Sequence, residues 1–267
     1  MSWKKSLFRI SMLALLYLSV MLIFYTIQPG LVFRPLDLKK DFTFQFDKVP
    51  EEFFISVDPK TDINALKFPT SKNRKGAIIY FHPFQDNIQR WGHLHKDFTA
   101  RGYDFWVYDY RGFGKSAGDV SEAELFSDAQ KIYDWINEKY PSEDILLYGK
   151  YMGGVVAANL ANQVTADMLI LEAPFNDLDH LFKKQYPWIW QPLKSRVDFS
   201  IRDQLALGIE APVHIIHGTR DFEVNFHLSV YLKEFLRAKD SYTLVDAGRH
   251  EILREFSRYQ AKLQELL

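Results

Sequence analysis

The chain contains no cysteine, which excludes disulfides, thiolate metal sites and cysteine catalysis but leaves the cellular compartment open. It also lacks a substantial net charge, since 33 basic and 34 acidic residues give −1, and nothing electrostatic favours nucleic-acid binding. Internal repeats and low-complexity tracts are absent as well. Aromatic side chains, in contrast, make up 16% of the 267 residues, which indicates apolar surface beyond an ordinary core. The length suits one large α/β domain.

The N-terminus carries an apolar segment. Residues 10–27 are uncharged over 18 positions, and basic residues precede them at 4, 5 and 9. This length just spans a bilayer and exceeds the ~7–15 residues of a signal-peptide core. Because no small-x-small cleavage pattern follows, we predict an uncleaved, single-pass signal anchor in residues 1–30; a cleaved signal peptide is the alternative. The basic flank places the N-terminus in the cytoplasm and residues 31–267 on the outer (periplasmic, extracellular or lumenal) side, although basic residues 34, 39 and 40 oppose that orientation.

Beyond the anchor, apolar patterning alternates between strand and helix periods. It predicts strands over residues 53–57, 63–68, 77–81, 103–108, 145–148, 168–171, 213–216 and 242–245. It predicts helices over residues 87–101, 121–140, 226–238 and 251–267, and one that begins at Gly153; Ser121 and Glu124 form a capping box for the second. Repeated strand–helix units require a mostly parallel, doubly wound sheet with helices on both faces, whose ligands bind beyond the carboxyl ends of the strands.

One segment, residues 175–210, is too long for a simple crossover between strands. We expect a small cap insertion there, which would shield an apolar pocket, with Trp188 and Trp190 as substrate-binding residues. The alternative is a surface excursion whose aromatic side chains only pack on the body of the domain.

Three motifs carry a resemblance to a known family. Residues 109–116 read Asp-Tyr-Arg-Gly-Phe-Gly-Lys-Ser, similar to the D-x-R-G-x-G-x-S block of α/β-hydrolases. Asp221 occupies the acid position of an H-G-x-x-D motif, and His250 lies in a block that resembles that of monoacylglycerol and lysophospholipid lipases. From about residue 31 to the end, the chain resembles membrane-anchored α/β-hydrolase-domain proteins, which are grouped with serine aminopeptidase-like and monoacylglycerol lipase-like hydrolases. The resemblance implies the α/β-hydrolase fold, with Asp221 and His250 as catalytic acid and base.

The nucleophile position departs from that pattern. Residues 149–153 read Gly-Lys-Tyr-Met-Gly between a strand and a helix, where the nucleophile elbow G-x-S-x-G has serine. Tyr151 therefore stands in the place of the nucleophile. Its hydroxyl projects about 4 Å farther from the backbone than that of serine, and a ~1 Å misplacement can cost a hundredfold in rate. The oxyanion hole would use the backbone N–H groups of Met152 and Phe84; Pro83, which precedes Phe84, has none.

A second match to G-x-S-x-G, at residues 114–118, centres on Ser116. It lies in a loop past its strand and lacks the strand–turn–helix context that the motif requires. The family resemblance assigns this serine a structural role, so we do not expect Ser116 to be a nucleophile.

Two functions remain open from the sequence. In the first, a membrane-tethered protein of the serine ester and peptide hydrolase lineage is catalytically impaired and binds a ligand or partner through its old site. In the second, an active hydrolase of acyl esters, lysophospholipids or peptides uses Asp221 and His250 with Tyr151 or an activated water. A third possibility is that Tyr151 is a mutation at the nucleophile position of an ordinary serine enzyme. We expect no cofactor and no metal; the partners would be the lipid bilayer and an apolar or acyl-bearing small molecule.

Overall fold

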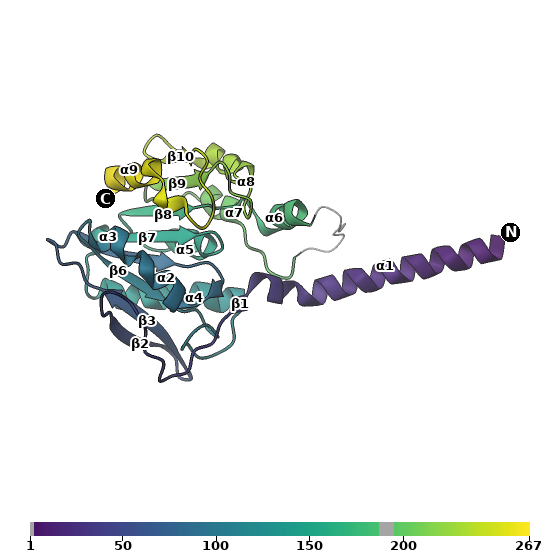
Figure 1. The fold of residues 1–267 in the computed structure, drawn as a ribbon, viewed down its shortest axis with the longest axis horizontal. Helices are drawn as coiled ribbons and strands as arrows, with labels where there is room; N and C mark the ends of the chain where they lie inside the picture. The colour runs from purple at the N-terminus through teal and green to yellow at the C-terminus, as the bar shows by residue number, and fades with distance from the viewer. Residues whose placement is uncertain (1–2, 187–194) are drawn as a thin grey trace.

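The computed structural model describes residues 3–186 and 195–267, with an eight-stranded sheet at the centre of the domain (Figure 1). The strand order is β10-β9-β8-β7-β4-β6-β3-β2, and only the β2–β3 and β3–β6 pairs of this sheet are antiparallel. The strands are β2 (Glu51–Asp58), β3 (Thr61–Phe68), β4 (Gly76–Phe81), β6 (Tyr103–Tyr108), β7 (Ile145–Lys150), β8 (Met168–Glu172), β9 (Val213–Gly218) and β10 (Ser241–Val245). The predicted mostly parallel sheet and its opening hairpin are confirmed.

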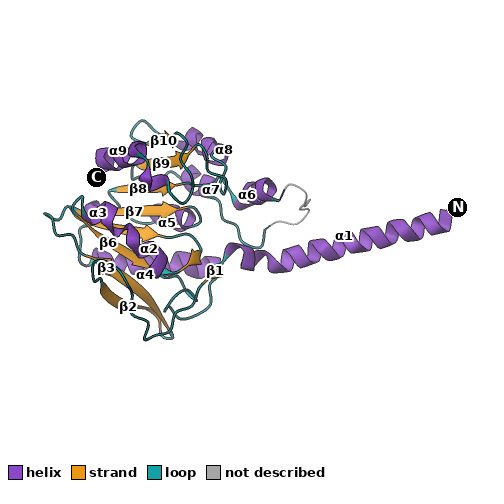
Figure 2. Ribbon diagram, viewed as in Figure 1, coloured by secondary structure: helices purple, strands orange, loops and turns teal. Residues whose placement is uncertain are grey.

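Helices cover both faces of the sheet (Figure 2). They are α2 (Ile88–Trp91), α3 (His95–Thr99), α4 (Glu122–Asn137), α5 (Gly153–Ala161), α6 (Leu178–Gln185), α7 (Ile201–Ala206), α8 (His227–Val230) and α9 (Ser257–Leu266). Strand β4 shows why the sheet is covered twice. Its Ala77, Ile79 and Phe81 join one hydrophobic cluster, and the alternate Ile78 and Tyr80 join the other. Successive side chains of a strand point to opposite faces of the sheet. When both sets are apolar, each face must be covered by a layer of helices.

Three predicted helices are shorter or more broken than expected. Residues 87–101 contain a 3₁₀ turn, Gly92–Leu94, between α2 and α3, and the segment 226–238 is α8 followed by the 3₁₀ turn Tyr231–Phe235. The closing helix α9 begins at Ser257 rather than at residue 251, because residues 247–252 form the turns that position His250. The Ser121 cap is confirmed: its Oγ accepts a hydrogen bond from the Glu124 N–H at 3.3 Å.

The N-terminal helix α1 (Trp3–Val32) projects from the domain (Figure 1). It is long and apolar enough to cross a membrane. Its last turns nevertheless pack on the domain, where Met21, Phe24, Gln28 and Val32 are buried. The chain then enters β1 (Arg34–Pro35), which pairs in parallel with β5 (Gln85–Asp86). Helix α1 therefore ends beside the loop that follows β4.

The expected cap insertion leaves the body at Asp177 and returns at Ser200, two residues that form an antiparallel bridge. Within it, α6 carries Leu181 and Phe182 on its buried side. Helix α7 at the return packs against α5 and belongs to the body, so a cap would end before it. Trp188 and Trp190, the predicted substrate-binding residues, lie outside the described residues. The domain boundaries stay a prediction.

Candidate functional site

The turn between β7 and α5 has the geometry of a nucleophile elbow. Tyr151 occupies the left-handed region with a φ of 51°, which the sharp strand-to-helix reversal requires. Both flanking glycines are needed for close packing. A Cβ on Gly149 would lie 2.5 Å from the Gly154 Cα, and a Cβ on Gly153 would lie 2.1 Å from the Phe81 carbonyl oxygen. The elbow predicted from the glycine spacing is therefore present, with tyrosine at its apex.

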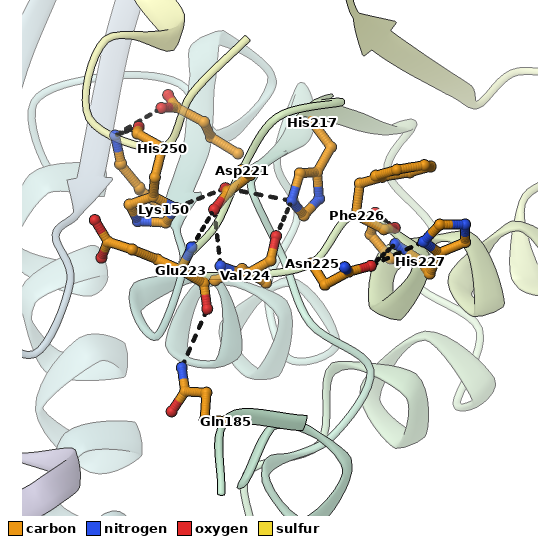
Figure 3. Close-up of polar contacts among 12 residues, drawn as sticks. Lys150, Gln185, His217, Asp221, Glu223, Val224, Asn225, Phe226, His227 and His250 are labelled. Carbon is orange, nitrogen blue, oxygen red and sulfur yellow. Dashed lines mark hydrogen bonds and ion pairs between the residues drawn. The ribbon is translucent and has the colours of Figure 1, made fainter. Parts of the chain in front are cut away.

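An acid–base pair faces the elbow from the loops after β9 and β10 (Figure 3). His250 Nδ1 lies 2.7 Å from Asp221 Oδ2. The other carboxylate oxygen accepts hydrogen bonds from the backbone N–H groups of Glu223 (3.0 Å) and Val224 (2.7 Å). Burial raises the pKa of Asp221, but hydrogen bonds from His217 and His250 outweigh it and hold that pKa well below its ordinary value.

The charge on Asp221 decides the tautomer of His250. An ionised carboxylate only accepts hydrogen bonds, so His250 Nδ1 donates and the lone pair of Nε2 points elsewhere. This Nε2 is buried and has no hydrogen-bond partner among residues 3–186 and 195–267. In a serine hydrolase the nucleophile's hydroxyl would occupy that place.

Tyr151 presents its ring, not its hydroxyl, to His250. The two rings meet edge to face, with centroids 5.4 Å apart and planes at 86°, and Phe175 packs on the tyrosine at 5.8 Å. Tyr151 and Gln185 of α6 line the same cavity. Burial raises the pKa of Tyr151 to about 12. At pH 7 the phenolate therefore amounts to roughly one part in 10⁵.

The two predicted oxyanion donors line one small void. It measures ≈10 Å³ and is bordered by Met152, Phe84, Tyr151 and, just after α1, Arg34. That volume is at the lower limit for a single water-sized atom, which needs roughly 10–15 Å³. Neither backbone N–H of the pair has a hydrogen-bond partner within the described parts of the chain. The loop itself is held in place because Arg34 N–H donates to the Phe84 carbonyl oxygen at 2.8 Å.

A larger cavity of ≈550 Å³ opens above the elbow. Its walls come from the elbow, the end of α1 and the residues after it, α6 and the loop around Asp221. The lining residues are Leu31, Arg34, Tyr151, Met152, Leu181, Phe182, Lys184, Gln185, Tyr186, Asp221, Phe222, Glu223 and Asn225. The Gln185 side chain donates a hydrogen bond to the Glu223 carbonyl oxygen at 3.1 Å, which connects α6 to the loop around Asp221 (Figure 3).

A buried ion pair beneath the elbow is not predicted by the motifs. Lys150 Nζ lies 2.9 Å from Glu172 Oε1 and also donates to the His250 carbonyl oxygen at 3.0 Å. Glu172 Oε2 accepts hydrogen bonds from the hydroxyls of Tyr148 (2.7 Å) and Tyr259 (3.0 Å). Burial raises the pKa of Glu172, but Lys150 and the hydrogen bonds lower it below its ordinary value. The sequence does contain a signal for this ion pair, because the buried strands β7 and β8 each end in a charged residue, Lys150 and Glu172.

The hydrogen bonds of Ser116 fit the structural role that the family resemblance implies. Its Oγ donates to the Asp109 carbonyl oxygen at 2.7 Å and accepts from the Asn64 N–H at 2.9 Å, so both functions of the hydroxyl serve the loop.

Among the residues described, one group of side chains comes close to a metal-binding arrangement. Ligand atoms of Glu223, His250 and Glu251 lie within 4.8 Å of one another. The two carboxylates are exposed, and Glu251 already forms an ion pair with Arg90 at 2.9 Å, so the cluster gives no reason to assign a metal.

Comparisons with known proteins agree with the motifs. The family model for serine aminopeptidase, S33, matches residues 72–204, about half of the chain. Lysophosphatidylserine lipase ABHD12 of Danio rerio is 32% identical over 152 residues, which cover 51% of this chain and 40% of the relative. The same lipase of Rattus norvegicus is 31% identical, with 51% and 38% covered. The matched part thus spans about two fifths of these relatives.

Solved structures share the fold. The Pyrococcus furiosus esterase PF2001 superimposes with a TM-score of 0.68 at 17% identity, covering 88% of this chain and 96% of the other. A soluble variant of the Saccharomyces cerevisiae monoglyceride lipase, solved with a substrate analogue, gives a TM-score of 0.62 at 17% identity, with 85% and 96% covered. The predicted α/β-hydrolase fold is confirmed.

Proposed function

Since this chain belongs to the α/β-hydrolase superfamily, we propose that it is a membrane-tethered member that has lost ordinary serine-hydrolase catalysis and binds a ligand or partner through the old site. The observation that carries the proposal is Tyr151 at the apex of an otherwise well-formed elbow. The helix α1 would be the tether, with its N-terminus in the cytoplasm and the domain on the outer side. Protease accessibility of the domain in sealed membranes tests this orientation.

The chemistry of acyl transfer explains why catalysis would be lost. A nucleophile must place its oxygen within hydrogen-bond reach of the histidine that takes its proton. The Tyr151 ring instead packs edge to face with His250, and its hydroxyl forms no hydrogen bond with His250 Nε2, which has no partner among the described residues. The pKa of about 12 keeps this hydroxyl protonated at neutral pH. Removing the nucleophile alone costs about as much as removing the whole triad.

The cavity favours an acyl-bearing ligand. Its ≈550 Å³ falls in the usual range for small-molecule sites, roughly 300–1,000 Å³. Apolar Leu31, Leu181 and Phe182 line it together with charged residues of both signs, the cations Arg34 and Lys184 and the carboxylates Asp221 and Glu223. An apolar chain with an anionic or polar head fits such a lining. The curated relatives are named as lipases of one such amphiphile, lysophosphatidylserine.

A fluorophosphonate probe and a panel of acyl esters test the loss of catalysis. We expect no labelling and no hydrolysis by the native chain. The variant Tyr151→Ser restores a short hydroxyl at the elbow, so we expect it to be labelled, and the further change His250→Ala should abolish that labelling. Native protein that is labelled, and loses its labelling in His250→Ala, would contradict the proposal.

Binding is tested separately from catalysis with a fluorescent fatty acid. We expect Arg34→Glu to weaken binding because it reverses a charge at the cavity wall. The matched control is Lys72→Glu. Lys72 is exposed in the turn before β4, at the amino ends of the parallel strands, whereas the cavity lies beyond their carboxyl ends. Equal affinity of the two variants would argue against the cavity as the binding site.

One observation favours a second candidate, an active hydrolase of acyl esters, lysophospholipids or peptides. The Asp221–His250 pair is intact at 2.7 Å, with Nε2 free to activate a water molecule. In that case Tyr151→Phe would keep hydrolysis and His250→Ala would abolish it. Loss of hydrolysis in Tyr151→Phe would instead identify the tyrosine hydroxyl as the nucleophile.

A further inference from the structure

The anchor helix and the helix α6 touch within the apolar part of the anchor. The Phe24 ring lies 6.4 Å from that of Phe182 and 5.9 Å from that of Tyr186, and Phe24 is buried. Phe24 belongs to the uncharged segment 10–27, which just suffices to span a hydrocarbon core. A part of the domain that contacts this segment must therefore lie close to the bilayer surface.

Polar contacts to the domain occur close to Phe24 along α1. The Arg196 guanidinium lies 5.6 Å from the Tyr25 ring centroid, and its backbone N–H donates to Gln28 Oε1 at 2.9 Å. Tyrosine and basic residues are typical of the membrane interface, where the ring stays apolar and the cation reaches the headgroups. On α6, Lys183 and Lys184 are exposed, and such lysines attract anionic headgroups.

We infer that the exposed face of α6, with Lys183 and Lys184, lies in the lipid headgroup layer, and that the cavity over Tyr151 opens there. The inference rests on the membrane anchoring in the proposed function. Figure 1 shows α1 projecting from the side of the domain on which α6 lies. The continuity of this face with α1 identifies its partner as the bilayer surface rather than another protein.

The cavity wall supports the same placement. Leu31 and Arg34, which directly follow the membrane segment, line the cavity together with Lys184. Phe222, also in the lining, is 87% exposed, so its apolar ring is available to contact lipid. An acyl chain could enter such a cavity from the bilayer without crossing bulk water.

The absence of cysteine makes the depth of single positions measurable. A cysteine is introduced one at a time at Ser19 on the exposed side of α1, at Lys183 on α6, and at Lys72 in the turn before β4, all exposed positions. Each is labelled with the environment-sensitive dye NBD in the full chain. The labelled protein is reconstituted in vesicles of phosphatidylcholine and phosphatidylglycerol without bromine, with bromine on the acyl chains close to the headgroups, or with bromine near the ends of the acyl chains.

We expect blue-shifted emission and loss of intensity with brominated lipid at Ser19→Cys and at Lys183→Cys, and neither effect at Lys72→Cys. Quenching at Ser19→Cys with water-like, unquenched emission at Lys183→Cys would overturn the inference and leave the anchor intact. No quenching at Ser19→Cys would overturn the anchoring itself. Equal quenching at Lys72→Cys would also refute the inference, because the contact would not be specific to the α6 face.

Discussion

The buried Lys150–Glu172 pair leads to a quantitative prediction about stability. Both side chains are about 5% exposed and lie 2.9 Å apart. The change Glu172→Gln removes the negative partner and leaves a buried ammonium. Loss of one partner of a buried pair typically costs about 3–5 kcal/mol. We expect the lower end, about 3 kcal/mol, because Lys150 keeps its hydrogen bond to the His250 carbonyl oxygen.

The assay is thermal or urea unfolding of the detergent-solubilised chain, followed by circular dichroism. For a domain of this size each kcal/mol shifts the Tm by about 2–4 °C, so we expect a decrease of about 6–12 °C. The surface pair Glu51–Lys67, at 3.5 Å with Glu51 half exposed, provides the matched control. Glu51→Gln should cost less than about 1 kcal/mol.

A double-mutant cycle separates the pair from its surroundings. Lys150→Met combined with Glu172→Gln leaves no buried charge unpaired, so we expect the double variant to be more stable than Glu172→Gln alone. The pH dependence gives a second check. Because the pKa of Glu172 is lowered in the fold, its contribution is present above the unfolded value, about 4.3, and is lost as the pH falls through the lower folded value.

Two results would refute this reasoning. One is a cost for Glu172→Gln no larger than that of the surface control. The other is strict additivity of the two changes, which would mean that the ammonium and the carboxylate do not interact across the 2.9 Å that separates them.

Other predictions concern the elbow and the acid loop. Gly153→Ala places a Cβ 2.1 Å from the Phe81 carbonyl oxygen and should destabilise the fold by about 3 kcal/mol, measured by urea unfolding. Asp221→Asn should cost about 2 kcal/mol at pH 7; since the pKa of Asp221 is lowered in the fold, the difference from native should begin to shrink as the pH falls below about 4 and should be lost only as the pH passes through the lower folded value. Tyr151→Phe should leave stability below pH 10 nearly unchanged. Between pH 10 and the folded pKa of about 12, the native chain should lose about 2 kcal/mol relative to this variant, because its unfolded state ionises first.

The sequence was sufficient for the elements of the sheet and for the expectation that the residues of the candidate site lie together. Strands such as β4 are apolar at every position, and that pattern reports burial on both faces whatever the rest of the chain does. The elbow glycines, Asp221 and His250 follow strands at spacings that a parallel sheet converts into one cluster at one edge. Helix ends were less predictable, because the turns around His250 depend on contacts with β9 and the elbow rather than on local propensity.

Only the tertiary structure decided how these residues face one another. Nothing local indicates that the Tyr151 ring packs on His250, that Lys150 pairs with Glu172, or that Phe24 packs on Phe182. Each contact joins segments far apart in the chain, and its geometry is set by how the layers pack. The sequence by itself determined that a tyrosine stands where a serine hydrolase has its nucleophile. The fold decided that its ring packs edge to face with His250, because the elbow places Tyr151 in the wall of the cavity that Asp221 also lines.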